Sequence, residues 1–306
     1  MVELEPAHDL SHLKDAARIA ALLPNSERVD RIRRDRWIGY PRANRAVALL
    51  NELFKWPTKQ RMPNMLIVGP TNNGKSMIIE RFRRMNAVPP VPGETDKETI
   101  PIVAMQMPSE PSINRFYAML LAAVGAPMRP TNRTAELEHR TLALLRTIGT
   151  RVLIIDELHN ILAGSTKAQR EFLNLLRSLG NDLRIPLVGV GTKEAYLAIR
   201  SDDQLENRFE PLPLPVWEFG DDLRSLLSSF AASYPLRRRS ALGSDEIGHY
   251  VLTRSDGTIG EMAKLLSGAA IAAIETGEEA ITAKTLALAA YKSPGERRRT
   301  FERELA

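Results

Sequence analysis

The sequence predicts an α/β protein, in which a parallel sheet is covered by helices on both faces and is followed by an all-helical domain. Short apolar runs alternate with helix-like stretches between residues 36 and about 216. This alternation is typical of parallel strands connected by helices. After Glu218 no strand-like run is evident, and the chain continues in segments with helical periodicity. Both observations favour one α/β domain with a smaller helical domain behind it.

The elements follow in order along the chain. The predicted strands are MLIVG (65–69), IPIVAMQM (100–107), RVLIIDE (151–157), IPLVGVGT (185–192) and PLPLPVW (211–217). The later helices are predicted within 220–234, 244–254, 258–275 and 282–291, each beginning near a Gly, Ser or Thr that can cap a helix. We expect a helical N-terminal arm (1–35), the α/β core (36–217), a helical lid (218–292) and a basic C-terminal tail (293–306). The proline-containing segment 87–99 is expected to be an exposed loop.

Composition excludes several classes of protein. The chain has 306 residues, of which 43% are hydrophobic and 26% charged, which is ordinary globular chemistry. It opens with MVELEPAHDL, which is acidic and contains a proline, so no secretory signal is expected. The longest mostly apolar stretch, LLSGAAIAAI (265–274), is about half of the roughly 20 residues that a membrane span needs. The absence of cysteine excludes disulfides, thiolate catalysis and cysteine-bound zinc. We therefore expect a cytoplasmic protein without membrane contact.

Arginine is unevenly distributed. The formal net charge is only +5, but arginines gather in residues 28–45, 235–240 and 294–304. One such cluster is equally well explained as a solvated helix face. Three together favour a polyanionic partner.

The segment GPTNNGKS fits the pattern G-x-x-x-x-G-K-[ST] at every position. A strand pattern precedes it and a helix pattern follows it, whereas a chance glycine-rich turn would lack this context. Gly69 and Gly74 permit the tight turn, Lys75 supplies charge near the β- and γ-phosphates, and Ser76 offers a ligand for Mg²⁺. The expected ATP-binding residues are Gly69, Pro70, Thr71, Asn72, Asn73, Gly74, Lys75, Ser76 and Met77.

Asp156 and Glu157 end the buried strand of RVLIIDELHN, where carboxylates are costly unless they serve a metal or water. We expect Asp156 to hold Mg²⁺ through water and Glu157 to orient or deprotonate the attacking water. The alternative is an exposed acidic strand end. His159 makes DELH similar to a helicase box, but no other helicase motif is found, so we expect His159 to be a loop or capping residue.

Two further residues are candidates for catalysis. Thr192, at the end of the next buried strand, could bind the γ-phosphate or the lytic water, or could be a plain strand-end threonine. Arg208, just before the last strand, could reach a neighbouring subunit's nucleotide as an arginine finger. Its alternative is a local salt bridge with Glu206 or Glu210.

The order of these motifs resembles that of an AAA+ P-loop NTPase. The motifs are GPTNNGKS, LIIDE, Thr192 and ENRF, followed by a helical lid. Two segments more narrowly resemble the transposon protein TniB, a relative of TnsC and MuB. They run from RWIGYPRANR to NNGKS and from IDELHN to GVGTKEA. The likeness spans about residues 30–290. It implies an ATPase that assembles on duplex DNA as a ring or helical filament, recruits a transposase and a target-selection protein, and is disassembled by hydrolysis.

The resemblance also implies roles for further residues. Trp37, Ile38 and Tyr40 lie where related ATPases line the adenine pocket, although packing in the N-terminal core explains them equally well. The resemblance, together with the charge clusters, makes five loop residues candidates for DNA contact, namely Arg129, Thr131, Arg133, Lys167 and Arg170. One departure is Gly260, which stands where many AAA+ lids carry an arginine that senses the γ-phosphate.

Two other functions remain open on the sequence alone. A helicase loader or client-remodelling ATPase would have the same core but would act on a protein. A small-molecule kinase would use Arg208 and the lid to clamp a phosphate acceptor. The Asp-Glu pair at the end of its strand, in place of a substrate-binding motif, counts against the kinase.

Overall fold

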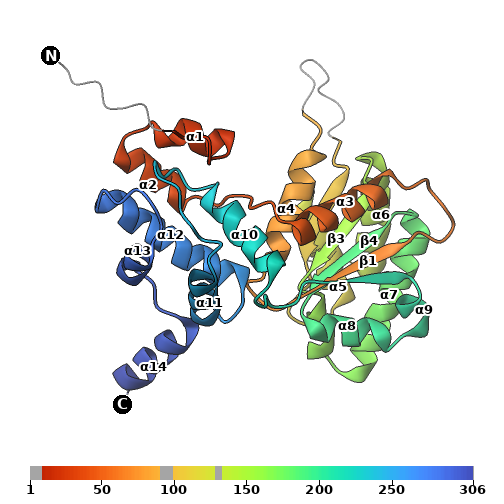
Figure 1. Ribbon diagram of the computed structural model, residues 1–306. Coiled ribbons are helices and arrows are strands. Elements are labelled where there is room, and N and C mark those ends of the chain that lie inside the picture. The colour runs from red at the N-terminus through yellow and green to blue at the C-terminus, as the bar shows by residue number, and fades with distance from the viewer. Residues whose placement is uncertain (1–8, 90–98, 128–132, 306) are drawn as a thin grey trace. The chain divides into compact units, whose positions relative to one another are not determined.

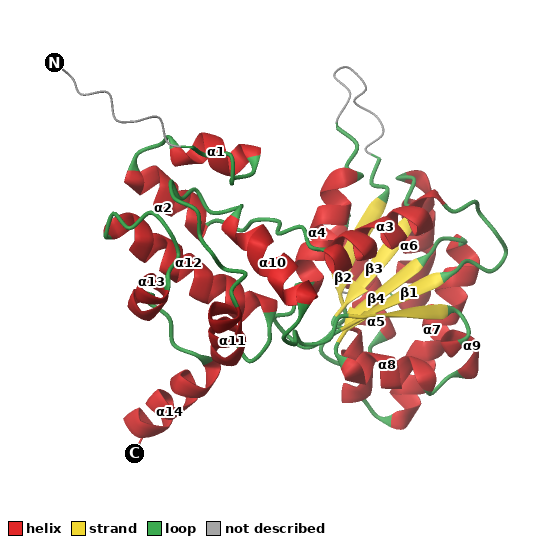
Figure 2. Cartoon of the chain, viewed as in Figure 1, coloured by secondary structure: helices red, strands yellow, loops and turns green. Residues whose placement is uncertain are grey.

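The computed structural model describes residues 9–89, 99–127 and 133–305. Five parallel strands form one sheet in the order β2-β3-β4-β1-β5 (Figures 1 and 2). The strands are β1 (Asn64–Val68), β2 (Ile102–Gln106), β3 (Val152–Asp156), β4 (Leu187–Gly191) and β5 (Phe209–Pro213). Each overlaps a run that the sequence predicted, although β1 and β5 begin one and two residues earlier, and the prediction of a parallel sheet is confirmed.

The central strands are apolar because both of their faces are covered. β4 is buried along its whole length, and β3 is buried up to its terminal Asp156. Gly189 in β4 shows how closely the layers approach, because a Cβ there would lie 2.6 Å from Leu158 and 2.8 Å from Leu66. A side chain at this position would push the two leucines away from the sheet.

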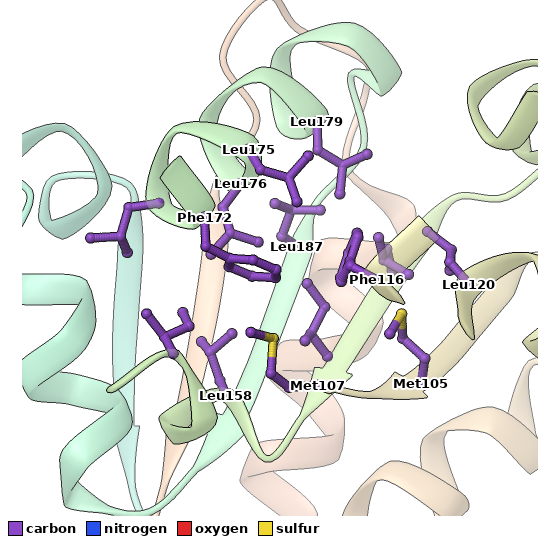
Figure 3. Close-up of a cluster of buried hydrophobic side chains, with 14 of the residues drawn as sticks. Met105, Met107, Phe116, Leu120, Leu158, Phe172, Leu175, Leu176, Leu179 and Leu187 are labelled. Atoms are coloured by element: carbon purple, nitrogen blue, oxygen red, sulfur yellow. The ribbon is translucent and has the colours of Figure 1, made fainter. Parts of the chain in front are cut away.

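One face of the sheet is covered by α5 (Ile113–Ala123), α6 (Thr134–Thr147), α7 (Thr166–Leu183) and α8 (Lys193–Arg200). Their apolar residues form a single buried cluster with the strands. Figure 3 shows Phe116 of α5 and Phe172 of α7 together over this cluster, and their rings meet edge to face with centroids 5.3 Å apart. This packing fixes the strands whose ends carry the candidate site.

The other face is assigned to α4 (Lys75–Met85), because the β1-α4-β2 crossover runs in the opposite direction along the sheet and such crossovers are right-handed. Phe82 of α4 packs edge to face against Phe54 of α3 (Pro41–Lys55), with centroids 6.1 Å apart. Two short elements complete the α/β region: the 3-10 helix η1 (Leu158–Ala163) and α9 (Asp203–Glu206). Helices therefore cover both faces, as predicted.

The helical region is built around α12 (Ile259–Glu275), most of whose apolar residues are buried. Its other helices are α1 (Asp15–Ala21), α2 (Asn25–Arg33), α10 (Asp221–Ala231), α11 (Asp245–Arg254), α13 (Ala283–Leu288) and α14 (Pro294–Leu305). Among the capping residues that the sequence offered, Thr282 forms a capping box with Thr285, whereas Ser244 and Thr258 make no side-chain cap bond.

Contacts group the described chain into two units. The helical unit contains residues 9–44, 72–74 and 216–305, and the α/β unit contains residues 45–71 and 75–215. The expected N-terminal arm therefore packs with the helical lid, where α2 contacts α12. The expected basic tail is the helix α14, which has no buried residue. The four-part division with its exact boundaries stays a prediction.

A buried ion pair fastens α2 within the helical unit. The Arg28 side chain is fully buried, and its guanidinium binds both carboxylate oxygens of Glu279, with Nη1 2.8 Å from Oε1. It also donates to the carbonyl oxygen of Pro235, from Nε at 3.0 Å and from Nη2 at 2.7 Å. Burial acts to raise the pKa of Glu279, but the bonds from Arg28 and the Arg237 amide outweigh it and lower that pKa.

In the part of the chain that the structure describes, no single helix is long and apolar enough to cross a membrane. The pair α11 and α12 passes a test of length and composition only when taken together, and it is bent by 116° at the break.

Replacing Arg28 tests the contribution of this ion pair. Arg28→Met leaves the mostly buried Glu279 carboxylate without its ion-pair partner, so the free energy of unfolding should fall by about 3–5 kcal/mol. Arg33→Met is the matched control, because Arg33 is mostly exposed and pairs only loosely with Asp30, and it should change the free energy by less than about 1 kcal/mol. Urea unfolding followed by tryptophan fluorescence measures both changes. Equal effects of the two substitutions would contradict the prediction.

Candidate nucleotide-binding site

The loop GPTNNGKS connects the end of β1 to the start of α4. Its first glycine is required by packing, because a Cβ on Gly69 would lie 2.5 Å from the carbonyl oxygen of Leu214. Two other loop residues, Asn72 and Gly74, have left-handed backbones with φ of 62° and 85°. The loop therefore turns tightly into the amino end of α4, where the first helix amides and the helix dipole favour an anion.

Lys75 is the first residue of α4, and its ammonium group bends back over the loop. Nζ donates to the carbonyl oxygens of Gly69 and Pro70, each at 2.7 Å. Burial lowers the pKa of Lys75, while the carboxylates of Asp156 and Glu157 act in the opposite direction. The predicted lysine and acid pair thus interact electrostatically, although they are about 80 residues apart in the sequence.

Sheet order explains this proximity. The carboxyl ends of parallel strands meet at one edge, and β4 is the only strand between β1 and β3. The phosphate loop follows β1, the acid pair ends β3, and Thr192 follows β4. The three predicted groups therefore share one edge of the sheet, with Thr192 on the strand between the other two.

The two carboxylates have different surroundings. Burial raises the pKa of Asp156, and a hydrogen bond from the Glu157 amide to Oδ1 at 2.8 Å only partly offsets it. Glu157 has a left-handed backbone with φ of 55°, which is uncommon for a residue other than glycine and aims its side chain differently from the strand. The Glu157 side chain is nearly half exposed, so the catalytic roles of the two carboxylates stay a prediction beside the alternative of an acidic strand end.

His159 contacts the acid pair directly, which the sequence analysis did not anticipate. Its Nε2 lies 3.2 Å from Oε2 of Glu157, and within the described residues its buried Nδ1 has no hydrogen-bond partner. It lies inside the short 3-10 helix η1, whose N-cap is Glu157, so it is neither the loop residue nor the cap that the sequence suggested. The spacing of two residues in DELH is the sequence signal for this contact.

Oxygen ligands suited to Mg²⁺ are present at this edge. Ser76 lies in the first turn of α4, and Asp156 offers a carboxylate at the end of β3. Within residues 9–89, 99–127 and 133–305, no group of three or more His, Asp or Glu residues could hold a metal by itself. Mg²⁺ is commonly bound by one or two protein oxygens together with substrate phosphates and water.

Thr192 precedes α8, and its hydroxyl donates to the carboxylate of Glu194. The hydroxyl therefore already has a partner two residues away on its own chain. A role toward phosphate or water would require it to exchange this partner, so that role stays a prediction.

Arg208 lies at the opposite edge of the sheet from its own phosphate loop. It directly precedes β5, and its carbonyl oxygen accepts a hydrogen bond from the amide of Asn64 at the start of β1. Its side chain donates to Asn181 at 2.9 Å, while Glu206 pairs with Arg200 at 3.0 Å. Arg208 is thus remote from the site of its own subunit, as a finger acting on a neighbour would be.

The aromatic segment expected near adenine belongs to the helical unit. Ile38 and Tyr40 are buried, and the ring of Tyr40 meets Trp217 edge to face at 5.1 Å. The Tyr40 hydroxyl also lies 3.4 Å from where a Cβ on Gly74 would stand, so it approaches the phosphate loop. Trp37 is partly buried. Core packing accounts for Ile38 and Tyr40, and contact with adenine stays a prediction.

The candidates for DNA contact are only partly described. Arg129 and Thr131 lie outside the described residues. Arg133, Lys167 and Arg170 are exposed, and Lys167 pairs loosely with Glu171 at 3.8 Å. Because α7 follows β3, its first turns, which carry Lys167 and Arg170, lie toward the edge of the sheet that holds the phosphate loop.

Several arginines of the first two clusters are used inside the helical unit. Besides Arg28, Arg36 stacks over the ring of Tyr234, and Arg42 pairs with Asp222 at 2.9 Å. In the second cluster, Arg237 donates to the carbonyl oxygen of Ala21. These side chains support the fold, so clustering along the sequence overstated the number of cations available to a polyanion.

Comparisons with known proteins identify the fold and the family of this chain. Comparison by sequence with curated proteins finds no match. Among solved structures, Cdc6p from Pyrobaculum aerophilum superposes with a TM-score of 0.56 at 15% identity, covering 82% of this chain and 68% of that one. The Aeropyrum pernix ORC2 protein, solved as ADPNP-ADP complexes, gives 0.55 at 15% identity and covers 84% and 69%. The Aeropyrum pernix ORC1 protein in complex with DNA gives 0.50 at 15% identity and covers 94% and 70%.

These likenesses confirm the AAA+ fold, with its P-loop core and following helical region. A family model described as "Bacterial TniB protein" matches residues 28–219. The matched segment includes the phosphate loop, the acid pair, Thr192 and Arg208. Because the match covers more than half of the 306 residues, the chain belongs to the TniB family.

Proposed function

We propose that this protein is an ATP-dependent, sequence-independent DNA-binding ATPase that regulates transposition. ATP binding promotes assembly on duplex DNA, the assembly recruits a transposase and a target-selection protein, and hydrolysis disassembles it. The observation that carries the proposal is the shared sheet edge of phosphate loop, acid pair and Thr192 in a chain of the TniB family. The DNA complex of the similar ORC1 structure supports the DNA-binding part.

Each residue at the edge has a role in this proposal. Loop amides and the Lys75 ammonium bind the phosphates, and Lys75 gives up its bonds to Gly69 and Pro70 to do so. Ser76 and Asp156 hold Mg²⁺, which when bound neutralises phosphate charge and orients the γ-phosphate. Glu157 accepts a proton from the attacking water or orients it.

Hydrolysis in this proposal depends on assembly. Arg208 stands at the edge of the sheet away from its own phosphate loop, so its guanidinium can act only on the nucleotide of a neighbouring subunit. A subunit alone would then bind ATP without hydrolysing it efficiently. The bond to Asn181 holds the Arg208 side chain in the free subunit.

Lys75→Ala tests nucleotide binding. A hydrogen bond to a charged group contributes about 1.5–3 kcal/mol, so ATP affinity should fall by about 10- to 100-fold. Lys55→Ala, at the exposed end of α3, is the matched control and should bind as the wild type does. Isothermal titration with a non-hydrolysable ATP analogue measures both. Unchanged affinity in Lys75→Ala would remove Lys75 from the site.

A mixing experiment tests Glu157 and Arg208 together. Glu157→Gln should bind ATP but not hydrolyse it, and Arg208→Ala should lose about 10³- to 10⁵-fold in rate with nearly normal binding. A mixture of the two variants should regain some activity, because an interface between them can contain an intact acid and an intact arginine. A steady-state phosphate-release assay across mixing ratios measures this. No recovery at any ratio would place Arg208 within one subunit's site or outside catalysis.

DNA binding should depend on nucleotide and salt. Fluorescence anisotropy with random-sequence duplex should show tighter binding with the ATP analogue than with ADP, and the log-log salt slope should be about −0.9 per phosphate neutralised. The triple substitution Arg133→Glu, Lys167→Glu and Arg170→Glu should weaken binding and flatten this slope while sparing ATP affinity. Arg61→Glu is the control, since the exposed Arg61 precedes β1 at the opposite edge.

Two results of this titration would overturn the DNA-scaffold proposal. Equal affinity for DNA in both nucleotide states would separate DNA binding from the ATP cycle. No binding in either state would remove DNA as the partner. Both results favour the alternative, a helicase loader or client-remodelling ATPase that uses the same core on a protein.

A further inference from the structure

The middle of the phosphate loop is held by the first turn of α12. The amide of Gly260 donates to the carbonyl oxygen of Asn72 at 3.0 Å, and the amide of Ile259 donates to Oδ1 of Asn73 at 3.4 Å. The Asn72 side chain donates from Nδ2 to Oε1 of Glu261 at 3.1 Å. All of these residues belong to the helical unit.

Glycine at position 260 is a condition of this contact. A Cβ there would lie 1.8 Å from Oδ1 of Asn72 and 2.3 Å from its Cγ. Any side chain would push the Asn72 amide away from Glu261. Many AAA+ lids carry an arginine at this position. In this chain the position is a glycine, which lets the helix contact the loop directly.

Glu261 is a buried carboxylate with an unusually complete set of partners. It is only 5% exposed. Oε1 also accepts from Lys264 Nζ at 2.8 Å, and Oε2 accepts from Arg297 Nη2 at 3.0 Å. The Tyr291 hydroxyl lies 3.0 Å from Oε2, and equally 3.0 Å from the carbonyl oxygen of Arg254. Burial acts to raise the pKa of Glu261, but the bonds from Arg297, Lys264 and Tyr291 outweigh it and lower the pKa to about 2.

An ionised Glu261 fixes the orientation of Asn72. A carboxylate only accepts hydrogen bonds, so it selects the amide NH₂ of Asn72 and rejects the amide oxygen. Asn72 has a left-handed backbone, with φ of 62°, and lies directly before the loop residues whose amides, in the proposed function, bind the phosphate. Holding its side chain and its carbonyl oxygen at once limits the motion of this part of the loop.

The partners of Glu261 reach the C-terminal helix. Arg297 belongs to α14, which has no buried residue and leaves Phe301 and Leu305 exposed. Two ion pairs join the described part of α14 to the helices before it, Arg297 with Glu261 and Glu296 with Arg254. The position of α14 is therefore linked to Glu261, and through Glu261 to Asn72.

We infer that Glu261 is a positioning residue for nucleotide binding, which acts through Asn72 and is supported by Arg297 of the C-terminal helix. The inference rests on the proposed binding of ATP by this loop. Its consequence is that α14 influences nucleotide affinity although it contributes no group to the phosphate site. Movement of α14 would release Arg297 from Glu261 and loosen the loop.

A double-mutant cycle tests this inference with a fluorescent ADP analogue, titrated against the full-length protein. Glu261→Ala should weaken binding about tenfold, which is the scale of one hydrogen bond to a charged group. Asn72→Gly keeps the left-handed backbone and removes the amide. In the Asn72→Gly background, Glu261→Ala should have little further effect, because its route to the loop is already lost. A merely structural role would give the same loss in both backgrounds.

Two substitutions on α14 complete the test. Arg297→Met should weaken binding several-fold, whereas Arg298→Met, which changes an exposed neighbour, should leave it unchanged. If Glu261→Ala does not fold, Arg297→Met in the two Asn72 backgrounds gives the same comparison. Gly260→Ala should reproduce the loss by displacing the Asn72 amide.

The outcomes separate this inference from the proposed function. The role of Glu261 is overturned, and the ATP proposal stands, if Glu261→Ala binds the analogue as tightly as the wild type does. The same holds if Glu261→Ala lowers affinity by the same factor in the wild-type and Asn72→Gly backgrounds. If the wild-type protein binds no analogue, and Lys75→Ala gives the same result, the ATP proposal is overturned and this inference falls with it.

Discussion

The site depends on one constraint, which is that parallel strands end at a common edge. β1, β3 and β4 each contribute a polar group at the point where burial ceases, and the order of the sheet decides which groups become neighbours. Gly69 shows how little freedom this edge leaves, because the carbonyl oxygen of Leu214 occupies the space of a Cβ. The packing of the strands therefore sets the shape of the phosphate loop before any ligand binds.

The charges at this edge are incompletely balanced. Burial disfavours the ionised forms of both Lys75 and Asp156, as the directions of their pKa shifts show. Each lessens the cost for the other, and Lys75 also uses two loop carbonyls in place of an anion. Such partial compensation suits a site that exchanges a highly charged ligand, because neither group has a partner so strong that binding must first break a close ion pair.

Sequence patterns predicted the sheet, the loop and the acid pair because these features are local. A strand run, a glycine turn and a helix start occupy adjacent residues, and their order alone implies a common edge. The helical unit was less predictable, because its key contacts join distant parts of the chain. Arg28 meets Glu279, and Asn72 meets Glu261, across separations of 251 and 189 residues. Nothing in the local pattern around Arg28 distinguishes it from a solvated arginine.

The same topology places Arg208 far from the groups that gather at the phosphate-loop edge. Parallel strands that bring Asp156 and Thr192 to one edge must place a residue that precedes a strand at the other. At about 3.3 Å per residue, a five-residue strand separates the two edges by roughly 16 Å, which is more than twice the length of an arginine side chain. A finger at this position therefore cannot serve its own nucleotide. If it acts as proposed on a neighbouring subunit, assembly must precede efficient hydrolysis.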